Sequence, residues 1–314
     1  MNKFVPMLLL LAAGPAFAQT PPAAPIDQLE PETAYSLGEY IDDTYQAARS
    51  INGLLFPVEG SYYPSPNFPK WKDPVCLNVY GLSPAAKYVV ERRIREIAVQ
   101  VGAPVDRREP CQPNVVIAFS SDPAATLKSI ADVRPYLVQG AGLICNGVRE
   151  GLPIQAWYTS MMQGADGAFR INPGCRGFDD SYYFYGGPPV LRAESIGHLE
   201  TGFRRKLGAV TIIVDTKAAI GMPLGALADH FAMLVLAESR PTRRCKEIES
   251  IANLMLKDCN PALAPKHITD NDIKMLTALY NVDDDRLGSL QYVRMIADMR
   301  KALKAEREQA EAGR

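Results

Sequence analysis

The chain has 314 residues, with 34 lysine or arginine residues, 35 aspartate or glutamate residues and a formal net charge of −1. This balance excludes the basic footprint of a nucleic-acid-binding protein and the polybasic patch of a protein that binds membranes by charge. The length is sufficient for one large domain with an N-terminal extension.

The N-terminus has the pattern of a secretory signal peptide. Lys3 precedes an apolar run over 8–13, and Ala16 and Ala18 are small residues at the two positions that signal peptidase recognises. No later stretch reaches about 18 uninterrupted apolar residues. We therefore expect cleavage after Ala18, export to the periplasm or the medium, and no mature transmembrane segment.

Six cysteines in an exported chain indicate disulfide bonds, because the compartment is oxidising. The cysteines are Cys76, Cys111, Cys145, Cys175, Cys245 and Cys259. Fifteen pairings are formally possible. Sequential pairing is our working hypothesis, since each consecutive pair closes a loop of modest length.

Four segments are expected along the chain. These are a signal peptide over 1–18, an extension or linker over 19–70, a main domain over 71–283, and a C-terminal helix with a charged tail over 284–314. The extension is helical in pattern over 26–58, with Tyr40, Thr44, Ala47 and Ile51 near one face.

The main domain alternates strands and helices. Strands are expected over 75–80, 114–120, 154–161, 168–171 and 209–215, and helices over 84–101, 123–133, 223–238, 269–280 and 287–304. Ser83 and Pro84 predict the start of the second helix of the chain and Gly102 its end, and Thr269 to Asp272 resemble a capping box. The helix over 223–238 is apolar nearly all round, which predicts a central, buried position. The acidic run 281–286 is expected to cap the last helix, and the residues after 304 to form a frayed end. The plan is α+β.

Three signals near the C-terminus are informative together. The apolar helix is followed by SIANLML, which contains Met255, and then by ITDNDIKMLTALY over 268–280. The latter resembles the LSxxDIxxIQxLYG helix that follows the zinc motif of matrixin-type metzincins, and Met255 falls where such enzymes have a Met-turn. The chain thus resembles a zincin-like domain. This resemblance implies a mixed sheet, a long N-terminal helix, a buried former active-site helix and C-terminal helices.

The zinc motif itself is missing. In HExxH two histidines bind zinc and the glutamate is the general base. The corresponding positions carry Asp229, His230 and Met233, and a carboxylate paired with a thioether suits neither zinc nor magnesium. In a register with His230 first, the second ligand position is Leu234. We therefore expect no metal, no cofactor and no metallopeptidase activity.

Two interpretations of the apolar helix remain open. His230 is expected to be a hydrogen-bonded core histidine, and Asp229 to have a basic or donor partner such as arginine or tyrosine, because an unpaired buried carboxylate costs several kcal/mol. Alternatively, the protein is a hydrolase with a nonstandard metal site around Asp229, His230 and Glu238, or one that uses carboxylates alone.

A binding function is the leading hypothesis. The aromatic loop DDSYYFYGGPP offers Tyr182, Tyr183, Phe184 and Tyr185 as contact residues, unless these rings cover the core. The resemblance also implies that the strand before the apolar helix, 209–215, accepts an extended peptide by strand addition. The predicted protein is a non-catalytic pseudoenzyme whose partner is an unknown protein, peptide or envelope ligand. A structural envelope protein is the third possibility.

Overall fold

The computed structural model describes residues 31–55, 67–106, 110–133, 152–163, 169–171, 204–239, 245–256 and 259–313. The chain divides into two units, Met1–Tyr40 and Ile41–Arg314. The described part of the first unit is the beginning of helix α1 (Pro31–Leu54). The architecture given below is that of the second unit.

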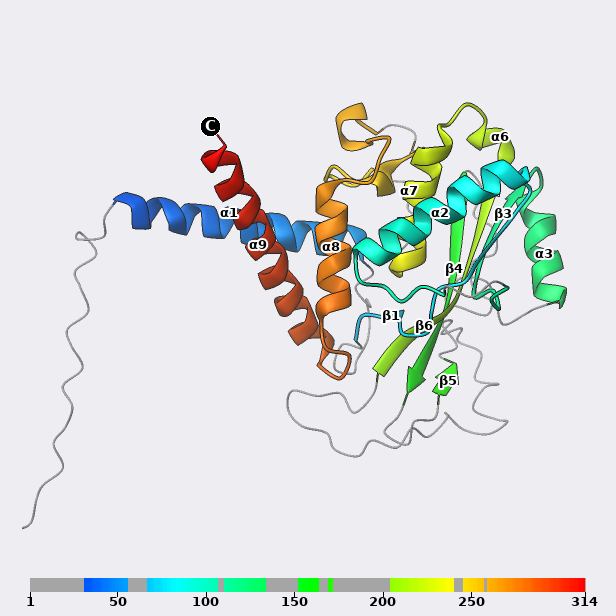
Figure 1. Cartoon of the computed structure of the whole chain (residues 1–314), viewed down its shortest axis with the longest axis horizontal. Helices are drawn as coiled ribbons and strands as arrows, with labels where there is room; N and C mark the ends of the chain where they lie inside the picture. Colours follow the sequence, from blue (N-terminus) through cyan, green and yellow to red (C-terminus); the bar gives the residue numbers. More distant parts are fainter. Residues whose placement is uncertain are drawn as a thin grey trace, which may run out of the picture. The chain divides into compact units, whose positions relative to one another are not determined.

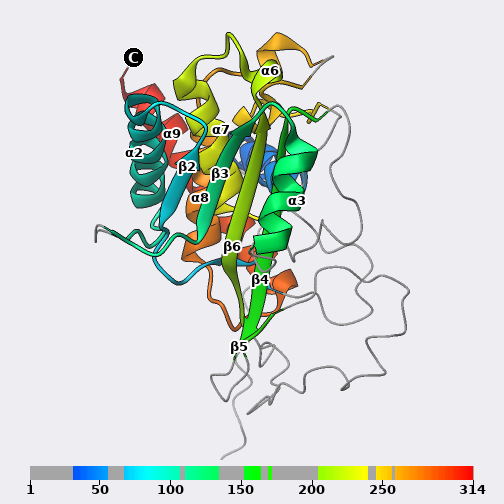
Figure 2. The same ribbon diagram turned by 90° about the vertical axis from the view of Figure 1, so that its right-hand side faces the viewer.

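The described strands form one mixed sheet (Figure 2). They are β1 (Lys70–Trp71), β2 (Leu77–Tyr80), β3 (Val115–Ser120), β4 (Ile154–Gln163), β5 (Phe169–Ile171) and β6 (Arg204–Asp215). The order is β2-β3-β6-β4-β5, and β1 pairs with the start of β6. Strands β2, β3 and β6 are parallel, whereas β4 is antiparallel to β6 and β5 is antiparallel to β4. The expected mixed sheet is confirmed.

Strand β6 lies in the interior of the sheet. It pairs with β3 from Val210 to Asp215 and with β4 from Arg204 to Val214. Its backbone groups are therefore already used on both sides, and the expectation that 209–215 accepts a peptide by strand addition is wrong.

The helices cover both faces of the sheet (Figures 1 and 2). Besides α1 they are α2 (Pro84–Gln100), α3 (Pro123–Val133), α6 (Thr216–Ala219), α7 (Leu224–Leu236), α8 (Asp270–Asn281) and α9 (Gly288–Ala312), with 3-10 turns at Ile251–Asn253 and Pro261–Leu263. Side chains alternate along β6, so that Val210, Ile212 and Val214 join the large core under α2 and α7. Ile213 instead packs with Leu127 of α3 on the opposite face.

Local signals set the helix boundaries that the sequence predicted. Ser83 caps α2, accepting a hydrogen bond from the Ala86 N–H, and Gly102 follows that helix with φ of 82°. Thr269 and Asp272 form a complete capping box at the start of α8. These predictions are confirmed.

The expected face of α1 is confirmed in part, because Ala47 and Ile51 lie on its buried face with Asp43, Ser50 and Leu54, whereas Tyr40 is 50% exposed. Two expectations about the last helix are wrong. Helix α9 continues beyond Lys304 to Ala312, because Arg307 pairs with Asp43 and Lys274 pairs with Glu306. The acidic run does not cap α9, since Asp284 pairs with Lys70 and Lys72.

Two disulfide bonds lie in the described residues. Cys76 is bonded to Cys111, and Cys245 to Cys259. Both follow the sequential pairing. The expected Cys145–Cys175 pair lies outside the described residues.

Candidate functional site

Helix α7 is the buried helix that the sequence predicted. Every residue from Ala226 to Leu236 is buried. The helix ends where Ala237 adopts an extended conformation, with φ of −138°. Trp71 Nε1 donates to the carbonyl of Val235 at 2.7 Å, and the Tyr280 hydroxyl donates to that of Leu236 at 2.9 Å. These bonds satisfy two carbonyls that the end of a helix would otherwise leave without partners.

Asp229 has the basic partner that its burial requires. Its carboxylate is 3% exposed and accepts from Arg93 of α2, at 2.5 Å from Nε and 3.2 Å from Nη2. It also accepts from the N–H of Ile268, at 2.8 Å. The hydrogen bond to Asp229 raises the pKa of Arg93. Asp229 therefore ties α7 to α2 and to the start of α8.

His230 is a core histidine. It is 7% exposed, and its Nδ1 lies 2.8 Å from the carbonyl oxygen of Ile251. Because a carbonyl can only accept, Nδ1 carries the proton. Burial lowers the pKa of His230. The imidazole is therefore neutral near pH 7, as expected for a hydrogen-bonded core residue.

Glu238 forms an ion pair with Arg205, which contacts neither Asp229 nor His230 through a hydrogen bond. It accepts from Arg205 Nη2 of β6 at 3.1 Å, and both side chains are buried. Arg205 Nη2 also donates to Ser160 of β4 at 3.1 Å. This network joins the end of α7 to the sheet.

The structure does not bring Asp229, His230 and Glu238 together. Each of them has a different protein partner. In the part of the chain that the structure describes, no three His, Cys, Asp or Glu side chains are placed to hold a metal ion.

One small cavity touches α7. It has a volume of about 30 Å³, and His230, Leu234, Ser239 and Lys246 are among the residues that line it. His230 and Leu234 are one helical turn apart, whereas Asp229 is bonded to α2 and Met233 is 1% exposed in the core. The face of α7 toward the cavity is therefore the 230/234 face and not the 229/233 face that the sequence comparison placed at the ligand positions.

Asp272 fixes the position of Ser250 and Ile251, at the start of the 3-10 turn that packs against α7. This buried carboxylate accepts from the Ser250 hydroxyl at 2.6 Å and from the N–H of Ile251 at 2.9 Å. Burial raises the pKa of Asp272. The chain then turns at Met255, whose φ of 65° is rare for a residue with a side chain. Ile251 thus links the His230 imidazole to the Asp272 carboxylate, beside the turn at Met255.

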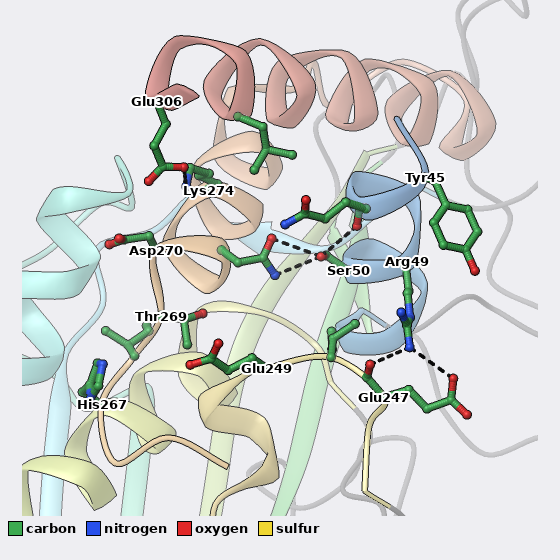
Figure 3. Close-up of a pocket in the computed structure, with 15 residues that line it drawn as sticks. Tyr45, Arg49, Ser50, Glu247, Glu249, His267, Thr269, Asp270, Lys274 and Glu306 are labelled. Atoms are coloured by element: carbon green, nitrogen blue, oxygen red, sulfur yellow. Dashed lines mark hydrogen bonds and ion pairs between the residues drawn. The ribbon is translucent and has the colours of Figure 1, made fainter. Parts of the chain in front are cut away.

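A larger, open groove is lined by residues of other elements, and no residue of α7 is among the described residues that line it (Figure 3). Its volume is about 680 Å³, in the range of ligand sites. The described residues that line it come from α1, from the segment after Cys245, from the start of α8 and from α9; they include Tyr45, Arg49, Ser50, Glu247, Glu249, His267, Thr269, Asp270, Asn271, Lys274 and Glu306. No sequence signal indicated this groove, because four distant segments form it.

Two ion pairs cross the groove. Arg49 pairs with Glu247 at 3.3 Å, and Lys274 pairs with Glu306 at 2.5 Å (Figure 3). Ser50 and Asn271 are joined by hydrogen bonds between their side chains. These contacts hold α1, α8 and α9 together around the groove.

The aromatic residues Tyr182, Tyr183, Phe184 and Tyr185 lie outside the described residues. Among the described helices, none is long and apolar enough to cross a membrane. In comparisons with known proteins, no family model, no curated protein and no solved structure matches the chain.

Proposed function

We propose that the protein is an exported, non-catalytic binding protein built on a zincin-like domain that has lost its zinc site. The proposal rests on the burial and the hydrogen bonding of the polar residues of α7. The polar residues at the motif positions, Asp229 and His230, are buried and bonded to Arg93 and Ile251. A catalytic metal site needs ligands that converge on an open position for water or substrate.

Several features support the zincin-like part of the proposal. The sheet is mixed, a long helix α2 precedes β3, and the buried helix α7 follows β6. Met255 lies in a turn close behind a segment that packs on α7, as a Met-turn would. In the register that begins at His230, Ala237 stands where HExxHxxGxxH has glycine, and α7 ends at that residue.

The export part of the proposal is supported by the signal-peptide pattern and by the two disulfide bonds. The alternative is a hydrolase with a nonstandard site around Asp229, His230 and Glu238. The separate partners of these three residues count against it.

Peptide hydrolysis tests the proposal. Purified protein without the signal peptide would be incubated with quenched fluorescent peptides, with and without added zinc, beside the variants His230→Ala and Asp229→Ala. We expect the same background rate in all three proteins. Zinc-dependent hydrolysis by the wild-type protein that either variant abolishes would contradict the proposal.

A further inference from the structure

The open groove contains more negative than positive charge. Of the described residues that line it, four are carboxylates and two are lysine or arginine. Glu247 and Glu306 are paired with the two cations. Glu249 and Asp270 are exposed, and neither makes a hydrogen bond or an ion pair with another described residue. Two carboxylates are therefore available to a ligand.

Aromatic and hydrogen-bonding groups accompany these carboxylates. The Tyr45 side chain is 68% exposed at one wall of the groove. His267 and Thr269 line the same wall as Asp270 (Figure 3). An exposed tyrosine ring attracts a cation and packs on the aliphatic stem of lysine or arginine. Charge and surface chemistry thus favour a cationic ligand.

The groove continues along α1. A second groove of about 560 Å³ shares Tyr45, Arg49, Glu247 and Ile248 with the first and extends to Gly53. It adds one cation, the half-buried Lys246, so the excess of negative charge lies in the first groove. Two open grooves joined along a helix fit an extended chain better than a compact small molecule.

We infer that the groove between α1, α8 and α9 binds a lysine- or arginine-bearing segment of a partner protein, with Glu249 and Asp270 as the contacts for its cationic side chains. The inference rests on the proposed function, because it names the partner class of a binding protein. The proposed binding surface includes no residue of α7.

The test uses a fluorescein-labelled decapeptide of alternating lysine and serine, with a glutamate-serine decapeptide for comparison. Binding is followed by fluorescence polarisation to the whole mature protein and to the double variant Glu249→Gln/Asp270→Asn. The matched control is Asp132→Asn/Glu311→Gln, which removes the same charge from exposed helical residues that line neither groove. Circular dichroism melts verify that each variant is folded.

We expect the lysine peptide to bind the wild-type protein and the glutamate peptide not to bind. The groove variant should bind about three- to tenfold more weakly, as for the loss of two exposed ion pairs, while the control stays within about twofold. Binding should also weaken between about 50 mM and about 500 mM salt, because exposed charges are screened.

Other results would overturn the inference. These are equal weakening in both variants, equal binding of both peptides, no binding to the wild-type protein, or tighter binding of a free polyamine than of the lysine peptide. The last result would assign the groove to a small organic cation. None of these results bears on hydrolysis or metal content, so a failure here leaves the pseudoenzyme proposal to its own test.

Discussion

Polar side chains on and next to α7 are buried and paired, whereas two of those in the groove beside α1 are exposed and unpaired among the described residues. Under α7, Asp229, His230 and Glu238 are buried, and each is bonded to a protein group. In the groove, Glu249 and Asp270 are exposed and have no partner among the described residues. Polar groups satisfied inside the fold stabilise it, whereas exposed groups in a concave surface are available for binding. The comparison predicts that substitutions under α7 change stability and substitutions in the groove change binding.

The largest expected effect is that of Arg93→Met. It leaves the buried Asp229 carboxylate with the Ile268 N–H as its remaining partner. Because the Arg93 side chain is 38% exposed and water screens the pair, the loss should be about 2–3 kcal/mol, below the cost of breaking a fully buried pair. Urea unfolding measures the loss. Arg92→Met is the matched control, because Arg92 is exposed and its partners, the carboxylate of Glu96 and the ring of Tyr88, are exposed as well. Its cost should stay below about 1 kcal/mol. Equal effects of the two substitutions would show that Asp229 does not depend on Arg93.

A designed histidine tests which face of α7 borders the cavity. Leu234→His would place a second imidazole one turn from His230, a spacing that binds zinc on a helix. Zinc at about a hundredfold excess over its dissociation constant should then stabilise the variant by about 2.7 kcal/mol. Met233→His is the control and should not respond, because position 233 points into the core. If only Met233→His were stabilised by zinc, the 229/233 face of α7 would be the one that borders the cavity.

The pH dependence of stability tests the state of His230. Its pKa is lowered by burial from a usual value of 6.5, so the unfolded chain binds this proton more readily than the folded one. The free energy of unfolding should therefore fall as the pH drops below about 6.5, by at most about 1.4 kcal/mol per pH unit.

The control for this prediction is His230→Asn, whose amide can still donate to Ile251. The difference in unfolding free energy between about pH 7.5 and about pH 5.5 should shrink in this variant. An unchanged difference would mean that other groups cause the pH dependence.

The smallest effect on stability is expected in the groove. Glu249→Gln/Asp270→Asn removes two exposed charges without described partners, so the free energy of unfolding should change by about 0.5 kcal/mol or less. Thermal and urea unfolding provide the measurement. A loss of several kcal/mol would show that these carboxylates hold the fold together and would remove the contrast with α7.

The sequence was most informative where local chemistry decides structure. Ser83 with Pro84, the capping box at Thr269 and the apolar run of α7 predicted helix positions that the structure confirms. The burial of α7 also made a donor for Asp229 a physical requirement, although the sequence could not name Arg93, which is 136 residues away in the chain.

Long-range arrangement was less predictable. The interior place of β6 depends on which strands flank it, and the continuation of α9 depends on contacts that Glu306 and Arg307 make with distant residues. The groove depends on four segments that meet only in the folded protein. Spacing within one segment contains no information on such contacts.

Metal content tests the central claim most directly. The protein without residues 1–18, purified without a histidine tag and exposed to zinc, would be analysed by elemental mass spectrometry beside Asp229→Ala and His230→Ala. The account predicts far less than one zinc per chain in all three proteins, with the variants less stable but unchanged in metal. Near-stoichiometric zinc in the wild-type protein that is lost in either variant would contradict it.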